Sequence, residues 1–147
     1  MKGKSFIFLF LSVVVIFSVA LFYFQNYAYY ESIDARQNMV FGNKMYKISN
    51  YQGIDSKTSG LKLRECFDID RLDDIDLPKY ENPTPLTAPF WFKCFNAEII
   101  TKDLEHGKAS AFLSKKEEFD GIDNVIAIYP DGKSYRWRQL NNKFTKE

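Results

Sequence analysis

The sequence is poor in the residues and motifs that carry chemistry in many proteins. Its 147 residues include one histidine, His106, and two cysteines, Cys66 and Cys94, which are too far apart for a C-x-x-C motif. It contains no nucleophile elbow, phosphate-binding loop, H-E-x-x-H zinc motif or c-type haem motif. We therefore expect a protein that is not an enzyme, with no catalytic residue, no metal site and no cofactor.

A strong charge of either sign is also missing. The chain has 20 basic and 19 acidic residues and a formal net charge of +1. Only two of the basic residues precede Tyr30, so the remainder of the chain has a net charge of −1. A nucleic-acid-binding protein carries a clearly basic face, and we therefore expect no nucleic-acid partner.

One long segment lacks charge altogether. Residues 5–24 are apolar except for their serines, and twenty helical residues span the roughly 30 Å hydrocarbon core of a bilayer. Lys2 and Lys4 precede this run and no basic residue follows it until Arg36. The positive-inside rule then predicts a cytoplasmic N-terminus, a lipid bilayer as partner of residues 5–24, and a C-terminal domain across the membrane.

A cleaved signal peptide is the alternative for this segment. Ser18-Val19-Ala20 is a small-x-small triplet of the kind that signal peptidases accept. The apolar run is longer than a usual signal sequence and continues beyond the triplet to Phe24, which favours an anchor that stays attached.

The rest of the chain predicts an α+β domain with an antiparallel sheet and one main helix. We divide the chain into an anchor with an aromatic belt (1–30), a linker (31–44) and an extracytoplasmic domain (45–147). The helix is expected to start at the N-cap Asn96 and stop at Gly107, with Ile99, Ile100 and Leu104 as its apolar stripe. Strands are expected at 44–49, 61–67, 109–114, 124–129 and 133–140, the last two joined by a turn at Pro130-Asp131-Gly132.

Two of these strands alternate in character. In residues 61–67, Leu63 and Phe67 share one face with Glu65, which is out of place on the buried side of a half-buried strand. In residues 133–140, Tyr135 and Trp137 form the expected core face, whereas Arg136 and Arg138 are expected in solvent.

The two cysteines are expected to form a structural disulfide. The topology above places both outside the cytoplasm, where disulfides persist, and closing their 28-residue loop would contribute roughly 3 kcal/mol. Two free buried thiols, or a redox or metal site, are the alternatives, although no histidine or methionine ligand lies nearby.

The segment "PLTAPFWFKCFNAE" around Cys94 is rich in proline and aromatic residues. We expect Phe92 and Phe95 to lie inward as a lid on the core. Phe90 and Trp91 would then be left partly exposed as a contact surface, and exposed aromatic residues on a rigid loop are typical interface anchors. The alternative is that every ring of this segment belongs to the buried core.

Four stretches resemble a family of small single-span bacterial proteins of unknown function: "YFQNYAYYE", "LRECF", "PLTAPFWFKCFNAE" and "GIDNVIAIYPDGKSYRWRQLN". The likeness runs from Tyr23 to Asn141, is patchy over 31–60, and includes both cysteines. It implies a bacterial inner-membrane protein with a periplasmic domain, and it implies no activity.

The sequence as a whole favours a membrane-anchored accessory or interaction protein that binds another membrane or periplasmic protein. A membrane-tethered redox or metal-handling factor that uses Cys66 and Cys94 is the first alternative, and an enzyme whose site forms only in the fold is the second.

Overall fold

The computed structural model describes residues 2–144 and divides the chain into an N-terminal helix and a folded domain that begins at Glu31. The helix α1 (Gly3–Asn26) has a mean hydropathy of 2.8 over its most apolar window and none of that window is buried. It is long and apolar enough to cross a membrane, as the sequence predicts.

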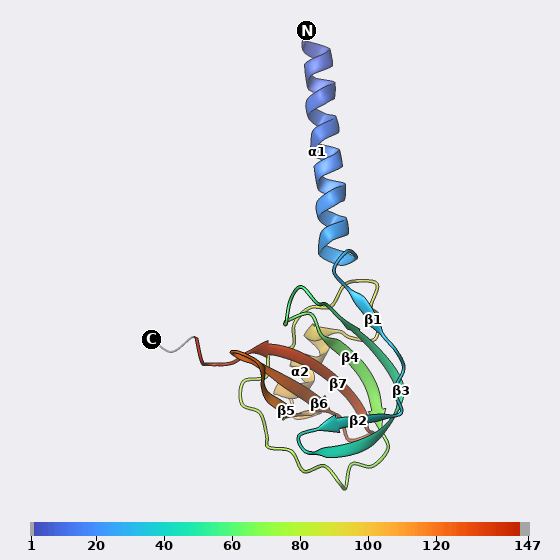
Figure 1. Ribbon diagram of the computed structural model, residues 1–147, viewed down its shortest axis with the longest axis vertical. Helices are drawn as coiled ribbons and strands as arrows, with labels where there is room; N and C mark the ends of the chain where they lie inside the picture. The colour runs from blue at the N-terminus through green and yellow to red at the C-terminus, as the bar shows by residue number, and fades with distance from the viewer. Residues whose placement is uncertain (1, 145–147) are drawn as a thin grey trace. The chain divides into compact units, whose positions relative to one another are not determined.

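The domain is built on one antiparallel sheet, which confirms the predicted α+β fold (Figure 1). The strands follow the order β1-β3-β4-β7-β6-β5, and β2 pairs with the first part of the long strand β3. Their bounds are β1 (Glu31–Ile33), β2 (Asn38–Phe41), β3 (Lys44–Asp55), β4 (Arg64–Ile69), β5 (Ser110–Phe119), β6 (Ile122–Ile128) and β7 (Lys133–Leu140).

The helix α2 (Ala97–Glu105) starts where the sequence predicts, and it crosses behind β6 and β7 in the view of Figure 1. The Asn96 side chain accepts a hydrogen bond from the Ile99 N–H at 3.1 Å, which makes it the N-cap. Ile100 is buried, but its neighbour Ile99 is 55% exposed, because adjacent helical positions point about 100° apart. His106 ends the helix, with its Nδ1 atom 2.7 Å from the Lys102 carbonyl oxygen.

The turn between β6 and β7 also forms at the predicted residues. The Gly132 N–H donates to the Tyr129 carbonyl at 3.0 Å, and Gly132 has a φ of 95°. This left-handed conformation is the one that a type I turn followed by a glycine bulge requires.

The segment 31–44 differs from the predicted linker. It forms β1 and β2, and Met39 and Phe41 of β2 are buried in the core. A two-residue loop, Gly42-Asn43, joins β2 to β3, with Gly42 in the left-handed region (φ 59°). Glycine followed by asparagine between alternating apolar residues is a hairpin signal, so the sequence carried this information in a run too short to show clear periodicity.

The sheet is covered on both faces, which the alternation of β4 did not predict. We call the face that carries Cys66 and Trp137 the loop face, and the opposite face, with Phe67 and Arg136, the hairpin face. The β2–β3 hairpin folds over the hairpin face, where the Phe41 ring stacks on Phe67 at 5.6 Å. The core cluster of this domain contains Met39, Phe41, Tyr46, Ile48, Tyr51, Phe67, Ile69, Ile126 and Ile128.

Candidate functional site

The aromatic and proline-rich segment of residues 85–96, here called the contact loop, lies between the strand β4 and the helix α2 in the sequence. The Phe92 N–H donates to the Pro89 carbonyl at 3.0 Å, which closes a turn. Phe90 and Trp91 occupy the two central positions of this turn. Phe90 is 57% exposed and Trp91 is half-buried, whereas Phe92 and Phe95 are buried.

A disulfide fastens the contact loop to the central strand β4. The Cys66 and Cys94 sulfurs are 2.16 Å apart, and the two Cα atoms are 6.3 Å apart. Cys66 is buried in β4 and Cys94 is half-buried near the end of the loop. The bridge holds the second half of the loop against the loop face.

Aromatic packing adds to the disulfide. The Phe95 ring meets Tyr135 and Trp137 of β7 edge to face, with centroid distances of 6.0 and 6.3 Å. Such pairs contribute about 0.5–1.5 kcal/mol beyond the area that they bury. Because Trp137 is fully buried, the contact loop is its cover on this face.

The buried Arg64 side chain holds the first half of the loop. Its Nε donates to the Leu86 carbonyl at 2.9 Å and its Nη2 to the Thr87 carbonyl at 3.2 Å. Its Nη1 donates to the Leu61 and Leu63 carbonyls at 2.7 and 2.6 Å. One guanidinium group thus ties the loop to the segment that leads into β4. Only arginine offers donors in this planar fork.

A surface hollow of about 370 Å³ lies beside the exposed Phe90. Its walls are Thr87, Ala88, Pro89, Phe90, Phe92, Lys93, Phe95, Asn96, Ala97 and Glu98. A partner side chain could enter it alongside the Phe90 ring. Of the two predicted contact residues, Phe90 lines this hollow and Trp91 is not among its walls. Their role in binding stays a prediction.

The arginines of β7 lie elsewhere than predicted: on the hairpin face Arg138 is buried and Arg136 is half-buried, instead of both being exposed to solvent. The Arg136 Nε donates to the Glu65 carboxylate at 2.5 Å, and the Tyr51 hydroxyl donates to the same carboxylate. Glu65 is 1% exposed. Its position in a buried strand is thereby explained, since a buried carboxylate requires a charged partner.

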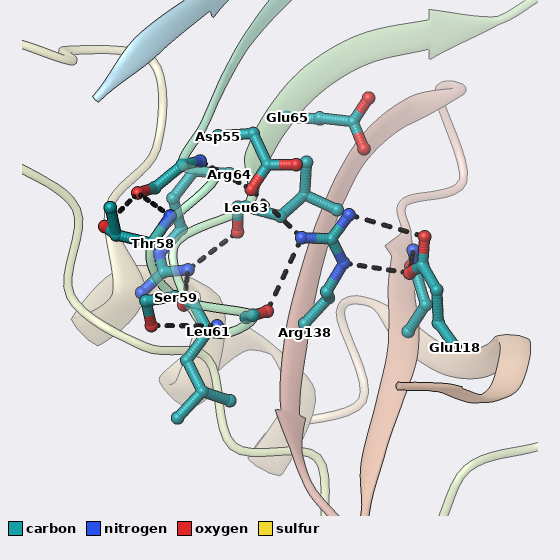
Figure 2. Close-up of polar contacts among 12 residues, drawn as sticks. Asp55, Thr58, Ser59, Leu61, Leu63, Arg64, Glu65, Glu118 and Arg138 are labelled. Atoms are coloured by element: carbon teal, nitrogen blue, oxygen red, sulfur yellow. Dashed lines mark hydrogen bonds and ion pairs between the residues drawn. The ribbon is translucent and has the colours of Figure 1, made fainter. Parts of the chain in front are cut away.

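Arg138 forms a second buried cluster (Figure 2). Its guanidinium donates to both carboxylate oxygens of Glu118, at 2.9 and 3.3 Å, and to Asp55 at 3.0 Å. Asn124 donates to Glu118 at 2.8 Å. Burial by itself would raise the pKa of Glu118, but the hydrogen bonds from Arg138 and Asn124 outweigh it and hold the pKa below its ordinary value.

These buried clusters are suited to holding the sheet together rather than to reacting with a substrate. Burial and the neighbouring Glu65 carboxylate raise the pKa of Tyr51 far above its ordinary value, so its hydroxyl stays protonated. Glu65 is closed to solvent. The sequence offered one sign of this arrangement, the acidic residue Glu65 on the apolar face of an alternating strand, but no sign of its partner.

Comparison with known proteins gives one match. Residues 35–147 match a family of unknown function, DUF6446, and this match covers more than half of the chain. The chain belongs to this family. No curated protein and no solved structure matches it. The DUF6446 match includes both cysteines and β2, which lies in the segment 31–44 that the sequence predicts to be a linker. The prediction that the chain belongs to a family of unknown function is confirmed. The DUF6446 match assigns no activity.

Proposed function

We propose that this protein is a membrane-anchored accessory protein that binds another membrane or extracytoplasmic protein through the contact loop. One observation carries the proposal: Phe90 is 57% exposed at the tip of a loop that a disulfide and Arg64 hold in place. An aromatic side chain on a rigid support loses little conformational entropy on binding, which is why such residues dominate the energetics of many interfaces.

The proposed location is the bacterial inner membrane, with the domain in the periplasm. Lys2 and Lys4 at the N-terminal end of α1 favour a cytoplasmic N-terminus. A disulfide between Cys66 and Cys94 favours an oxidising compartment for the domain.

The topology is tested with a reporter fused to the C-terminus. Alkaline phosphatase in this position should be active, because it requires export to form its own disulfides, and N-terminal sequencing should find Ser5 still attached. A mature N-terminus at Leu21 would instead identify residues 1–20 as a cleaved signal and refute the anchor.

The contact role is tested by comparing variants in partner capture. Membranes are extracted with a mild detergent, and the proteins that co-purify with the unaltered chain are quantified for Phe90→Ala and Trp91→Ala. Phe144→Ala, which removes another exposed ring outside the contact loop, is the matched control. We expect at least one partner to be lost with the loop variants and kept with the control, at an unchanged melting temperature.

Two results would contradict the contact role. Equal capture by all variants would show that the loop does not bind. A large drop in melting temperature for Trp91→Ala would show that this ring belongs to the core.

A thiol-redox role is the second candidate, since the disulfide lines a surface hollow of about 160 Å³ together with Gln52, Asp68 and Tyr135. In such a role a thiolate from a partner would attack one sulfur, form a mixed disulfide and release the other cysteine as a thiolate. Equilibration of the domain with glutathione buffers distinguishes the candidates. A redox protein exchanges near the potential of its compartment, whereas a structural disulfide has a reduction potential below about −300 mV and stays oxidised in these buffers.

A further inference from the structure

A second surface hollow, of about 350 Å³, is lined mainly by amide and carboxylate side chains. It shares no lining residue with the hollow beside Phe90. Its size lies in the range of ligand sites, about 300–1,000 Å³. The lining residues are Tyr80, Glu81, Asn82, Thr84, Asp123, Gln139, Leu140, Asn141 and Asn142.

The floor of this polar hollow is held rigidly by the carboxylate of Asp123, which is 6% exposed. One oxygen accepts from the Tyr80 hydroxyl at 2.9 Å. The other accepts from the Glu117 N–H at 2.9 Å and from the Asn141 amide at 3.1 Å. The tyrosine and the asparagine are thus fixed in orientation before any ligand arrives.

Gln139 of β7 holds the segment 82–84, another part of the lining of the polar hollow. Its Oε1 atom accepts from the Thr84 N–H at 2.7 Å and from the Trp137 indole N–H at 2.9 Å. Its Nε2 atom donates to the Asn82 carbonyl at 3.1 Å. The loop that carries Asn82 is therefore bound to β7 on both sides of Pro83.

The backbone is strained at Asn82, which lines the polar hollow, and at Glu117, whose N–H binds Asp123. Asn82 and Glu117 have φ angles of 57° and 44°, in the left-handed region that is unfavourable for a residue other than glycine. Asn50 is the other such residue among residues 2–144. Strain of this kind persists where surrounding bonds enforce it, and it is frequent at ligand sites.

The rim, in contrast, offers polar groups that the domain does not use. The carboxylate of Glu81 and the side-chain amide of Asn142 are exposed and form no hydrogen bond within residues 2–144. A rigid polar floor with unused donors and acceptors on its rim is suited to a ligand with several hydroxyl groups.

The lining also excludes other classes of ligand. Glu81 and Asp123 disfavour an anion, since each ionised carboxylate would repel it. Within residues 2–144 no three acidic, cysteine or histidine side chains are placed to hold a metal ion. Leu140 and the Tyr80 ring are the principal apolar surfaces in the lining, too few for an apolar peptide.

We propose that this polar hollow binds the neutral sugar units of a glycan. The Tyr80 ring offers an apolar surface for the face of a pyranose, and the carboxylate and amide groups of the rim bind its hydroxyls.

The proposal is tested with the full chain in phospholipid nanodiscs, prepared without glycoside detergents because their sugar headgroups would compete. The probes are neutral oligosaccharides of glucose, galactose, mannose and N-acetylglucosamine, first on an array and then by calorimetric titration of those that bind. Glu81→Gln and Asn142→Ala should each weaken the binding about tenfold, the usual effect of losing a hydrogen bond that involves a charged or well-placed group.

Matched controls are available on other surfaces of the domain. Glu105→Gln at the end of α2 and Asn38→Ala at the start of β2 change the same kinds of exposed residue outside the polar hollow, and should leave the affinity unchanged. The rim variants break no hydrogen bond or ion pair within residues 2–144, so their melting temperatures should stay at the wild-type value. Failure of every probe to bind at millimolar concentration, or binding that both rim variants leave unchanged, would overturn the proposal.

Discussion

The buried pair of Glu65 and Arg136 allows a quantitative test of what holds the sheet together. The side chains are 1% and 12% exposed, and the Arg136 Nε lies 2.5 Å from the carboxylate. Removing one partner of such a pair leaves the other charge buried, which costs about 3–5 kcal/mol. Unfolding a domain of this size changes the entropy by roughly 0.25 kcal/mol per degree, so each single variant should melt about 12–20 °C lower.

The perturbation is a double-mutant cycle of Glu65→Met and Arg136→Met. It is made in a Tyr51→Phe background, because the Tyr51 hydroxyl would otherwise lose its acceptor and add its own penalty. Replacing both charges by apolar side chains of similar length removes the uncompensated charge, and such replacements are often neutral or stabilising. We expect the double variant to be close to its background and a coupling free energy of at least about 3 kcal/mol.

The assay is urea denaturation of the full chain in phospholipid micelles, followed by tryptophan fluorescence. Urea is preferred to guanidinium, which is a salt and would screen the pair. Glu98→Gln breaks the exposed pair with Lys102 on α2 and serves as the control, with an expected loss of about 0.5 kcal/mol or less. Single variants that cost less than about 1 kcal/mol, or a double variant whose loss equals the sum of the two, would refute the reasoning.

Three further predictions concern the contact loop and the polar hollow. Replacing Cys66 and Cys94 by alanine should lower the free energy of unfolding by about 3.6 kcal/mol, the chain-entropy value for their 28-residue separation. In the denatured, unreduced wild type neither cysteine should react with an alkylating reagent. Quantitative labelling of both cysteines would refute the bridge. Arg64→Lys keeps the charge but loses the planar fork, so the free energy of unfolding should fall by about 2 kcal/mol and amide hydrogen exchange should rise in residues 86–88; unchanged exchange there would contradict the role of Arg64. Burial, together with the hydrogen bond to Asp123, raises the pKa of Tyr80 to about 12, whereas an unfolded tyrosine ionises near pH 10. The contribution of this residue to the free energy of unfolding is therefore complete below pH 10 and is lost as the pH rises toward 12. In urea denaturation, Tyr80→Phe should remove this part of the decline of the unfolding free energy with pH.

Local features of the chain were predictable because their causes lie within a few residues. The apolar run of α1, the Asn96 cap of α2 and the turn at Gly132 each depend on side chains and backbone conformations inside a short window. The same holds for the pairing of the cysteines, since two cysteines allow only one intramolecular bridge. These features follow from the sequence without knowledge of the rest of the fold.

Only the tertiary structure determines what covers each face of the sheet, and therefore which of its side chains are buried. Alternation shows correctly that Arg136 and Arg138 share a face, but the alternating pattern of a single strand is the same whether solvent or protein covers that face. Here the β2–β3 hairpin folds over it, although β2 lies in the segment 31–44 that the sequence predicts to be a linker. Glu65, Glu118 and Asp55 come from three other strands and neutralise the two guanidinium groups.

The same limit applies to the candidate sites. The turn that exposes Phe90 could be predicted from the nearby prolines. The hydrogen bonds from Arg64 to the loop, in contrast, join residues more than twenty positions apart in the sequence. The polar hollow combines the segment 80–84 with Asp123 and Gln139, which no short motif connects. Contacts of this range depend on strand register and on chain closure, which are properties of the whole domain. A local pattern therefore identifies the side chains that are available for a site, and only the assembled sheet determines which of them come into contact.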